Sequence, residues 1–156
     1  MPERREARTG HVDYSATPLP RKLGIRPGAV VAFLDAPEGF GDRLGPLPDG
    51  VVVRRRAQGE LDVIVLFVTS ASRLAARFGA AERALVPDGG LWVAWPKKTA
   101  GVPTDLDFET VQRTGLEAGL VDNKVAAIDA VWTSVRFVVR LADRPGRGRP
   151  RGTARR

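Results

Sequence analysis

The sequence predicts a single α/β domain, built on a mostly parallel sheet with an antiparallel strand pair at one end. Continuous apolar runs of strand length, such as residues 29–35 and 61–68, are typical of strands covered on both faces. Segments with helical periodicity alternate with these runs, as in α/β folds. The last strand-like segments, residues 120–129 and 133–142, are joined by only three residues, so they must pair antiparallel. A chain of 156 residues suffices for one such domain.

The first elements follow from caps and breakers. Thr17 and Pro18 predict the start of a short helix, because Thr is a good N-cap and Pro is favoured at the first helical position. Gly24 offers an end for this helix. After the first strand, residues 37–50 are rich in Pro and Gly, which predicts a loop with at most one helical turn. Residues 51–55 (VVVRR) then predict a short strand near an edge of the sheet.

A helix should follow the strand over residues 61–68, with Thr69 or Ser70 as its N-cap. Its apolar positions have helical spacing: Leu74, Phe78, Ala81 and Leu85. The run PDGG at 87–90 predicts a turn that ends this helix and leads into a strand over 91–95.

The next helix is expected over residues 108–118, capped by Thr104 or Asp107 and ended by Gly119. Acidic residues at its start offset the positive end of the helix dipole and need no catalytic explanation. The three tryptophans, Trp92, Trp95 and Trp132, are expected to pack in the core or in an oligomer contact.

Composition excludes several classes of chemistry. The chain has no cysteine, so disulfides, thiolate catalysis and thiolate metal sites are excluded. His11 is the only histidine, which excludes a histidine-based triad or metal cluster. The sequence shows no secretory signal and no apolar run long enough to span a membrane, which favours a cytoplasmic protein. The strong preference for Arg over Lys indicates a bacterium with a GC-rich genome.

The net charge of +7 belongs to the ends of the chain. Six arginines and no acid lie in residues 144–156, and residues 1–8 contribute one further positive charge, so residues 9–143 are neutral. We therefore expect a disordered arm (1–15), a domain (16–143) and a disordered tail (144–156). The tail could bind nucleic acid weakly and without sequence preference. Its candidate residues are Arg144, Arg147, Arg149, Arg151, Arg155 and Arg156.

Two segments carry a resemblance to known proteins. The run LDVIVLFV, followed by a helix and LVPDGGLWVAW, resembles the C-terminal half of class I S-adenosylmethionine-dependent methyltransferases, and LGIRPGAVVAFLDAPEGFG resembles their cofactor-binding strand and glycine loop. The resemblance implies a Rossmann-like, methyltransferase-like fold from about Leu23 to Leu141. The whole chain also resembles a family of small bacterial proteins of unknown function, through segments such as TPLPRKLGI and GLVDNKVAAIDAVW.

Three departures from the methyltransferase pattern argue against methyl transfer. Pro37 stands at the first glycine position of the expected loop, where it removes an amide donor and adds bulk. The second strand ends in Arg54, Arg55 and Arg56 in place of the acid that would hold the ribose. Only 25 residues separate Asp35 from Leu61, too few for the usual two helices and two strands. We predict that tight S-adenosylmethionine binding is absent.

The best candidate pocket combines the loop after the first strand with a lysine pair. Both segments should lie at the carboxyl edge of the sheet, where α/β folds bind ligands, and two ammonium groups would suit a small anion. The candidate residues are Asp35, Glu38, Gly39, Gly41, Lys97 and Lys98. The leading interpretation is a non-catalytic domain, or one that binds an unidentified ligand. The alternatives are an active enzyme that uses S-adenosylmethionine or another nucleotide, and a protein that binds nucleic acid through its tail.

Overall fold

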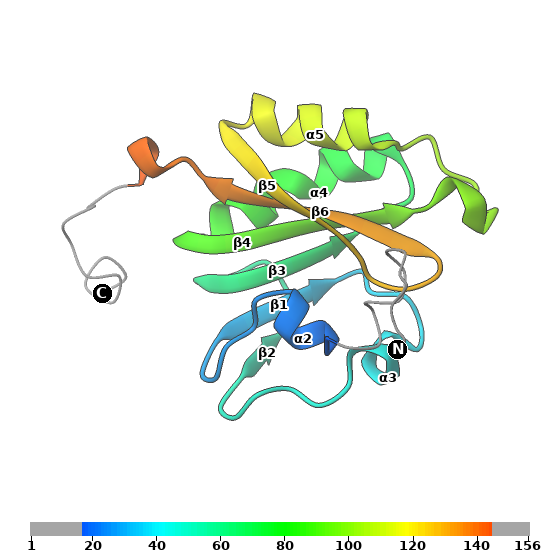
Figure 1. Cartoon of the computed structure of the whole chain (residues 1–156). Helices are drawn as coiled ribbons and strands as arrows, with labels where there is room; N and C mark the ends of the chain where they lie inside the picture. Colours follow the sequence, from blue (N-terminus) through cyan, green and yellow to red (C-terminus); the bar gives the residue numbers. More distant parts are fainter. Residues whose placement is uncertain (1–16, 145–156) are drawn as a thin grey trace, which may run out of the picture.

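The structure is a computed structural model that describes residues 17–144 (Figure 1). The predicted arm, with His11, and the tail beyond Arg144 lie outside the described residues. Within residues 17–144, no helix has both the length and the apolar composition needed to cross a membrane.

One six-stranded sheet, in the order β2-β1-β3-β4-β6-β5, forms the centre of the domain (Figure 1). Its strands are β1 (Val30–Leu34), β2 (Val52–Arg54), β3 (Leu61–Phe67), β4 (Leu85–Pro96), β5 (Leu120–Ala127) and β6 (Trp132–Val139). The first four strands run parallel, whereas β6 pairs antiparallel with both β4 and β5. The predicted parallel sheet with a terminal antiparallel pair is confirmed, with β6 inserted between β4 and β5.

Helices cover both faces of this sheet (Figure 1). On one face lie the short helices α2 (Leu19–Lys22) and α3 (Phe40–Leu44), and on the other lie α4 (Ala71–Ala84) and α5 (Phe108–Glu117). Successive strand residues point to opposite faces, so each strand feeds two cores. In β3, for example, Val63 and Val65 pack under α2 and α3, while Ile64 and Leu66 pack under α4 and α5.

Side-chain caps start the two longer helices. Ser70 Oγ accepts a hydrogen bond of 3.1 Å from the Arg73 N–H, and Asp107 Oδ1 accepts one of 2.8 Å from the Thr110 N–H. Each bond satisfies a donor that has no partner within the helix. The predicted caps Ser70 and Asp107 are therefore confirmed over their alternatives Thr69 and Thr104. The predicted start of α2 was wrong by one residue, because its N-cap is Pro18 and not Thr17.

The PDGG run corrects a second expectation. It lies inside β4 and is not a turn before it, because β4 already begins at Leu85. Leu61 of β3 pairs with Leu85 while Val63 pairs with Gly90, so residues 86–89 form a bulge in β4. A Cβ on Gly89 would lie 2.6 Å from the carbonyl oxygen of Asp62. Glycine is needed there because the two backbones approach closely.

Trp92 of β4 connects the sheet to the end of α2. Its side chain is only 1% exposed, and its indole Nε1–H donates a hydrogen bond of 3.0 Å to the carbonyl oxygen of Leu23. This bond fixes the end of α2 against the centre of the sheet. Trp92 and Trp95 lie in the core as predicted, whereas Trp132 is half-buried at the start of β6.

The helices leave part of one face uncovered. α4 packs mainly on β3 and β4, and α5 packs mainly on β5 and β6, so among the described residues neither helix has its main contacts with β2. Val52 of β2 is accordingly 45% exposed. Parallel sheets are normally covered on both faces, so this end of the sheet departs from the usual arrangement.

The contact between α5 and β6 gives a stability prediction. A Cβ on Gly115 would overlap the ring of Phe137, which is fully buried. We expect Gly115→Ala to destabilise the fold by about 1–3 kcal/mol through overpacking, which exceeds the gain of about 1 kcal/mol in helix propensity. Urea denaturation measures the difference in the free energy of unfolding between variant and parent.

The matched control is Gly79→Ala in α4, where the new Cβ meets only the flexible end of Arg83, at 3.1 Å. This variant should be as stable as the parent or more stable, and equal stability of both variants would contradict the packing argument.

Candidate functional site

The loop after β1 starts with Asp35 in a left-handed conformation. Its φ of 57° is the only positive value for a non-glycine among the described residues. The carboxylate forms a two-pronged ion pair with Arg77 of α4, with Nε–Oδ2 at 3.0 Å and Nη2–Oδ1 at 2.6 Å. Such paired bonds are geometrically specific and stronger than neutral hydrogen bonds. Asp35 therefore fastens α4 to the carboxyl end of β1.

The rest of this loop folds onto the sheet through Phe40. Gly39 has a φ of 86° and precedes α3, which places Phe40 at the first helical position. Phe40 is 6% exposed, and its ring centroid lies 5.2 Å from that of Phe33 and 4.9 Å from that of Phe67. Glu38 and Gly41, on either side, are exposed.

Trp132 extends this contact into a row of four rings. The Phe67 and Trp132 centroids are 5.2 Å apart with nearly perpendicular planes, the favoured edge-to-face geometry. The row of Phe33, Phe40, Phe67 and Trp132 crosses the carboxyl ends of β1 and β3 and the start of β6. We call it the aromatic row. Apolar rings, those of Phe40 and Phe67 buried, thus fill the space next to the loop where the sequence predicts a ligand.

Lys97 and Lys98 follow β4 at the same edge but have different neighbours. The Lys97 N–H donates a hydrogen bond of 2.7 Å to the carbonyl oxygen of Val131, in the turn between β5 and β6. Lys98 lies near the start of α5, close enough for its charge to act on Asp107. Trp132, the next residue after Val131, packs against Phe67, which in turn contacts Phe40 beside Gly39. A shared anion site for these two segments remains a prediction.

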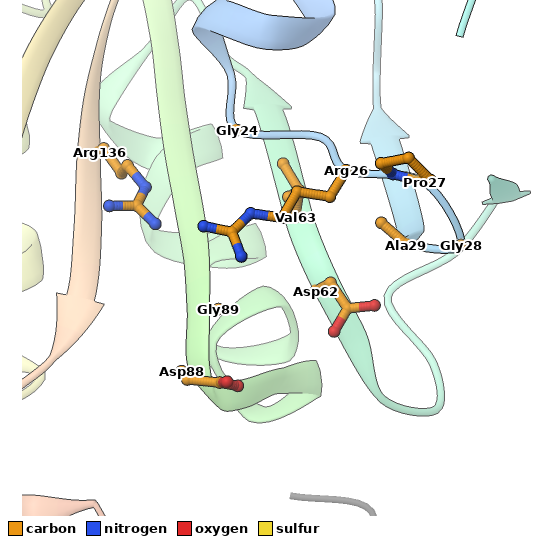
Figure 2. Close-up of a pocket in the computed structure, with 10 residues that line it drawn as sticks. All are labelled: Gly24, Arg26, Pro27, Gly28, Ala29, Asp62, Val63, Asp88, Gly89 and Arg136. Atoms are coloured by element: carbon orange, nitrogen blue, oxygen red, sulfur yellow. The ribbon is translucent and has the colours of Figure 1, made fainter. Parts of the chain in front are cut away.

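A pocket of about 400 Å³ lies at the opposite, amino edge of the strands (Figure 2). Figure 2 shows four charged side chains around it, those of Arg26, Asp62, Asp88 and Arg136. The Asp62 carboxylate accepts a hydrogen bond of 2.8 Å from the Val30 N–H, which joins the beginnings of β1 and β3. Its lining thus contains two basic and two acidic residues.

Arg136 lies against the backbone of β4. A Cβ on Gly90 would lie 2.5 Å from Nε of Arg136, so glycine makes room for the guanidinium. Burial lowers the pKa of Arg136, and the neighbouring charge of Arg144 lowers it further. The sequence signal for this pocket is weak, because its residues come from separate segments and the PDGG run resembles an ordinary turn.

The arginine candidates for nucleic-acid binding lie almost entirely outside the described residues. Only Arg144 is described, and its Nε donates a hydrogen bond of 3.1 Å to the carbonyl oxygen of Val139. Its side chain thus packs back on the end of β6. Residues 17–144 hold no cluster of three His, Asp or Glu side chains that could bind a metal ion.

Comparison with known proteins supports the fold. No family profile matches the sequence, and neither does any curated protein. Among solved structures, magnesium protoporphyrin IX methyltransferase from Synechocystis PCC 6803, with bound SAH, is similar with a TM-score of 0.54 and 11% identity over 83% of each chain. A SAM-dependent methyltransferase from Aquifex aeolicus is similar with a TM-score of 0.51 and 15% identity, over 75% of this chain and 85% of its own. The chain therefore has a methyltransferase-like Rossmann fold.

Asp107 gives a prediction about pH. Hydrogen bonding by Thr110 lowers its pKa below the ordinary value of 3.8, and the charge of Lys98 adds to this effect. Because the folded chain favours the ionised carboxylate, Asp107 stabilises the fold above pH 3.8, and this contribution is lost as the pH falls through the lowered pKa. Asp107→Asn keeps a capping oxygen but cannot titrate. In an acidic pH series, the Tm of the parent should therefore fall toward that of the variant. A constant difference in Tm would contradict the role of the ionised cap.

Proposed function

We propose that this protein is a ligand-binding domain of methyltransferase-like fold that does not transfer methyl groups from S-adenosylmethionine. The observation that carries the proposal is the ion pair between Asp35 and Arg77. In the family that the sequence resembles, the first strand leads into the loop that holds the cofactor. Here the acid at the end of the first strand is Asp35. Both of its carboxylate oxygens accept hydrogen bonds from Arg77, so its role is to hold α4 against β1.

Other groups of the same loop are committed as well. The Phe40 N–H donates a hydrogen bond of 3.1 Å to the carbonyl oxygen of Pro37, and the Gly39 carbonyl oxygen accepts one from the Arg43 N–H. Pro37 has no amide hydrogen to offer. The loop is thus held by its own backbone hydrogen bonds and, through Phe40, by the aromatic row.

The end of β2 also fails to fit the cofactor. Arg54, Arg55 and Arg56 are exposed at the position where the resemblance implies an acid for the ribose hydroxyls. A guanidinium has donors and no acceptor, so it cannot accept hydrogen bonds from hydroxyl groups as a carboxylate does. The residues present at β1 and β2 therefore do not fit S-adenosylmethionine.

Calorimetry tests the proposal directly. We expect titration of S-adenosylmethionine, and separately of S-adenosylhomocysteine, to give no saturable heat at micromolar concentrations, because Asp35 is bonded to Arg77 and arginines replace the expected acid after β2. Equilibrium dialysis with labelled S-adenosylmethionine provides an independent measurement. A low-micromolar Kd for either compound would contradict the proposal and favour the alternative, an active enzyme.

A second candidate function, weak binding of nucleic acid, follows from the distribution of charge. Residues 9–143 are neutral, whereas residues 144–156 contain six arginines. Removal of residues 145–156 should abolish binding in gel-shift titrations and leave the fold intact. For duplex DNA, the slope of log K (the binding constant) against log salt concentration should not exceed about 5 in magnitude, because six arginines neutralise at most six phosphates. Undiminished binding by the truncated chain would place the contact on the domain.

A further inference from the structure

A second pocket lies on the α4 side of the sheet, where β1 and β2 end. It has a volume of about 400 Å³, within the range of small-molecule sites. Its lining comes from the end of β1, the segment after β2, and the middle of α4: Leu34, Asp35, Arg55, Arg56, Ala57, Gln58, Ala76, Arg77 and Ala80. We call it the arginine pocket. Its position at the carboxyl edge of parallel strands is the usual one for ligands in α/β folds.

The arginine pocket has an excess of positive charge. Three arginines, Arg55, Arg56 and Arg77, line it together with a single acid, Asp35. Arg55 and Arg56 are exposed and form no ion pair with any other residue in the described part of the chain. Arg54, Arg55, Arg56 and Gln58 also line an adjoining hollow of about 200 Å³. Concentrated positive charge in a concave site attracts anions.

Asp35 orients one of these cations. It accepts hydrogen bonds from Nε and Nη2 of Arg77, which leaves two hydrogens on Nη1 and one on Nη2 for another acceptor. The left-handed φ of Asp35 is uncommon for a non-glycine residue, and such conformations often occur at ligand sites. Arg77 is therefore held in place before any ligand arrives, which reduces the entropy that binding would cost.

The remaining lining is mostly small and apolar. Leu34 and Ala57 pack against the core under α4, and Ala76 and Ala80 are exposed on the helix itself. These side chains leave room for a flat or compact apolar group beside the guanidiniums. A ligand with both an anionic and an apolar part would use both halves of the lining.

The arginine pocket exists because the connection from β1 to β3 is short. Residues 36–60 form only α3 and β2, and α3 lies on the other face. No helix from this connection covers β1 and β2 beside α4, so the space next to α4 remains open. Because this helix is missing, the expected cofactor site lacks one side, and the arginine pocket is open.

We propose that the arginine pocket binds a small phosphate ester, with the phosphate on Arg55, Arg56 and Arg77 and an apolar group over Ala57, Ala76 and Ala80. The fork of donors in a guanidinium matches phosphate oxygens, and several guanidiniums suit a diphosphate better than a single carboxylate. This inference rests on the proposed function, because it assigns a site and a ligand class to the binding domain.

Calorimetry with ADP, inorganic pyrophosphate and adenosine tests this inference on the full chain. ADP should bind with saturation, pyrophosphate more weakly, and adenosine at least tenfold more weakly than ADP. The double variant Arg55→Gln, Arg56→Gln should lose at least tenfold in affinity for ADP and keep the Tm of the ligand-free parent, because both side chains are exposed.

The matched control is Arg43→Gln with Arg113→Gln. It also removes two positive charges, but from exposed positions outside the pocket lining, so its affinity for ADP should stay within about twofold of the parent. Equal losses in both double variants would indicate attraction by overall charge and overturn the proposal. Undiminished binding by the Arg55, Arg56 variant would place the phosphate elsewhere and overturn it too.

The outcomes separate this inference from the proposed function. If neither ADP nor pyrophosphate binds, and S-adenosylmethionine does not bind either, the arginine pocket is refuted as a phosphate site while the proposed function stands. If S-adenosylmethionine binds tightly, the proposed function fails whatever ADP does. Binding of duplex DNA by the truncated chain, lost in the Arg55, Arg56 variant, would replace the small phosphate ester with a nucleic-acid partner.

Discussion

The length of the chain between β1 and β3 constrains the rest of this structure. The 25 residues 36–60 must leave the carboxyl end of β1 and return to the amino end of β3. They build one short helix, α3, and one edge strand, β2. The sheet therefore ends at β2, and α4 has no neighbouring helix over β1. The arginine pocket follows from this short connection, because no helix within it covers β1 and β2 beside α4.

The carboxyl edge illustrates how a shared fold can carry different chemistry. A fold does not determine function, because function depends on the groups that the site presents. Here Asp35 binds Arg77, and Phe40 packs on Phe67, so an acid and a loop that could hold a ligand instead stabilise the domain. The arginines after β2 then give the neighbouring surface the opposite charge from the one that the resemblance implies.

Charge is distributed unevenly over a neutral domain. At the amino edge, Arg26 and Arg136 lie with Asp62 and Asp88, and the opposite charges balance. At the carboxyl ends of β1 and β2 they do not, because Asp35 is a single acid among three arginines. Net charge alone conceals this difference, since Coulomb interactions depend on which charges lie within a few ångströms of each other.

The sequence by itself determined the order and type of the main elements and the parallel sheet with its antiparallel hairpin. It also narrowed each helix cap to two residues, Thr69 or Ser70 and Thr104 or Asp107. These features depend on local periodicity and on hydrogen bonds between residues close in the chain, which a sequence displays directly. It did not reveal that PDGG lies within β4, because the close backbone approach at Gly89 involves Asp62 on another strand. Nor did it pair Asp35 with Arg77, or bring Arg55 and Arg56 beside α4. These contacts join residues far apart in the chain, so only the packing of the helices on the sheet decided them.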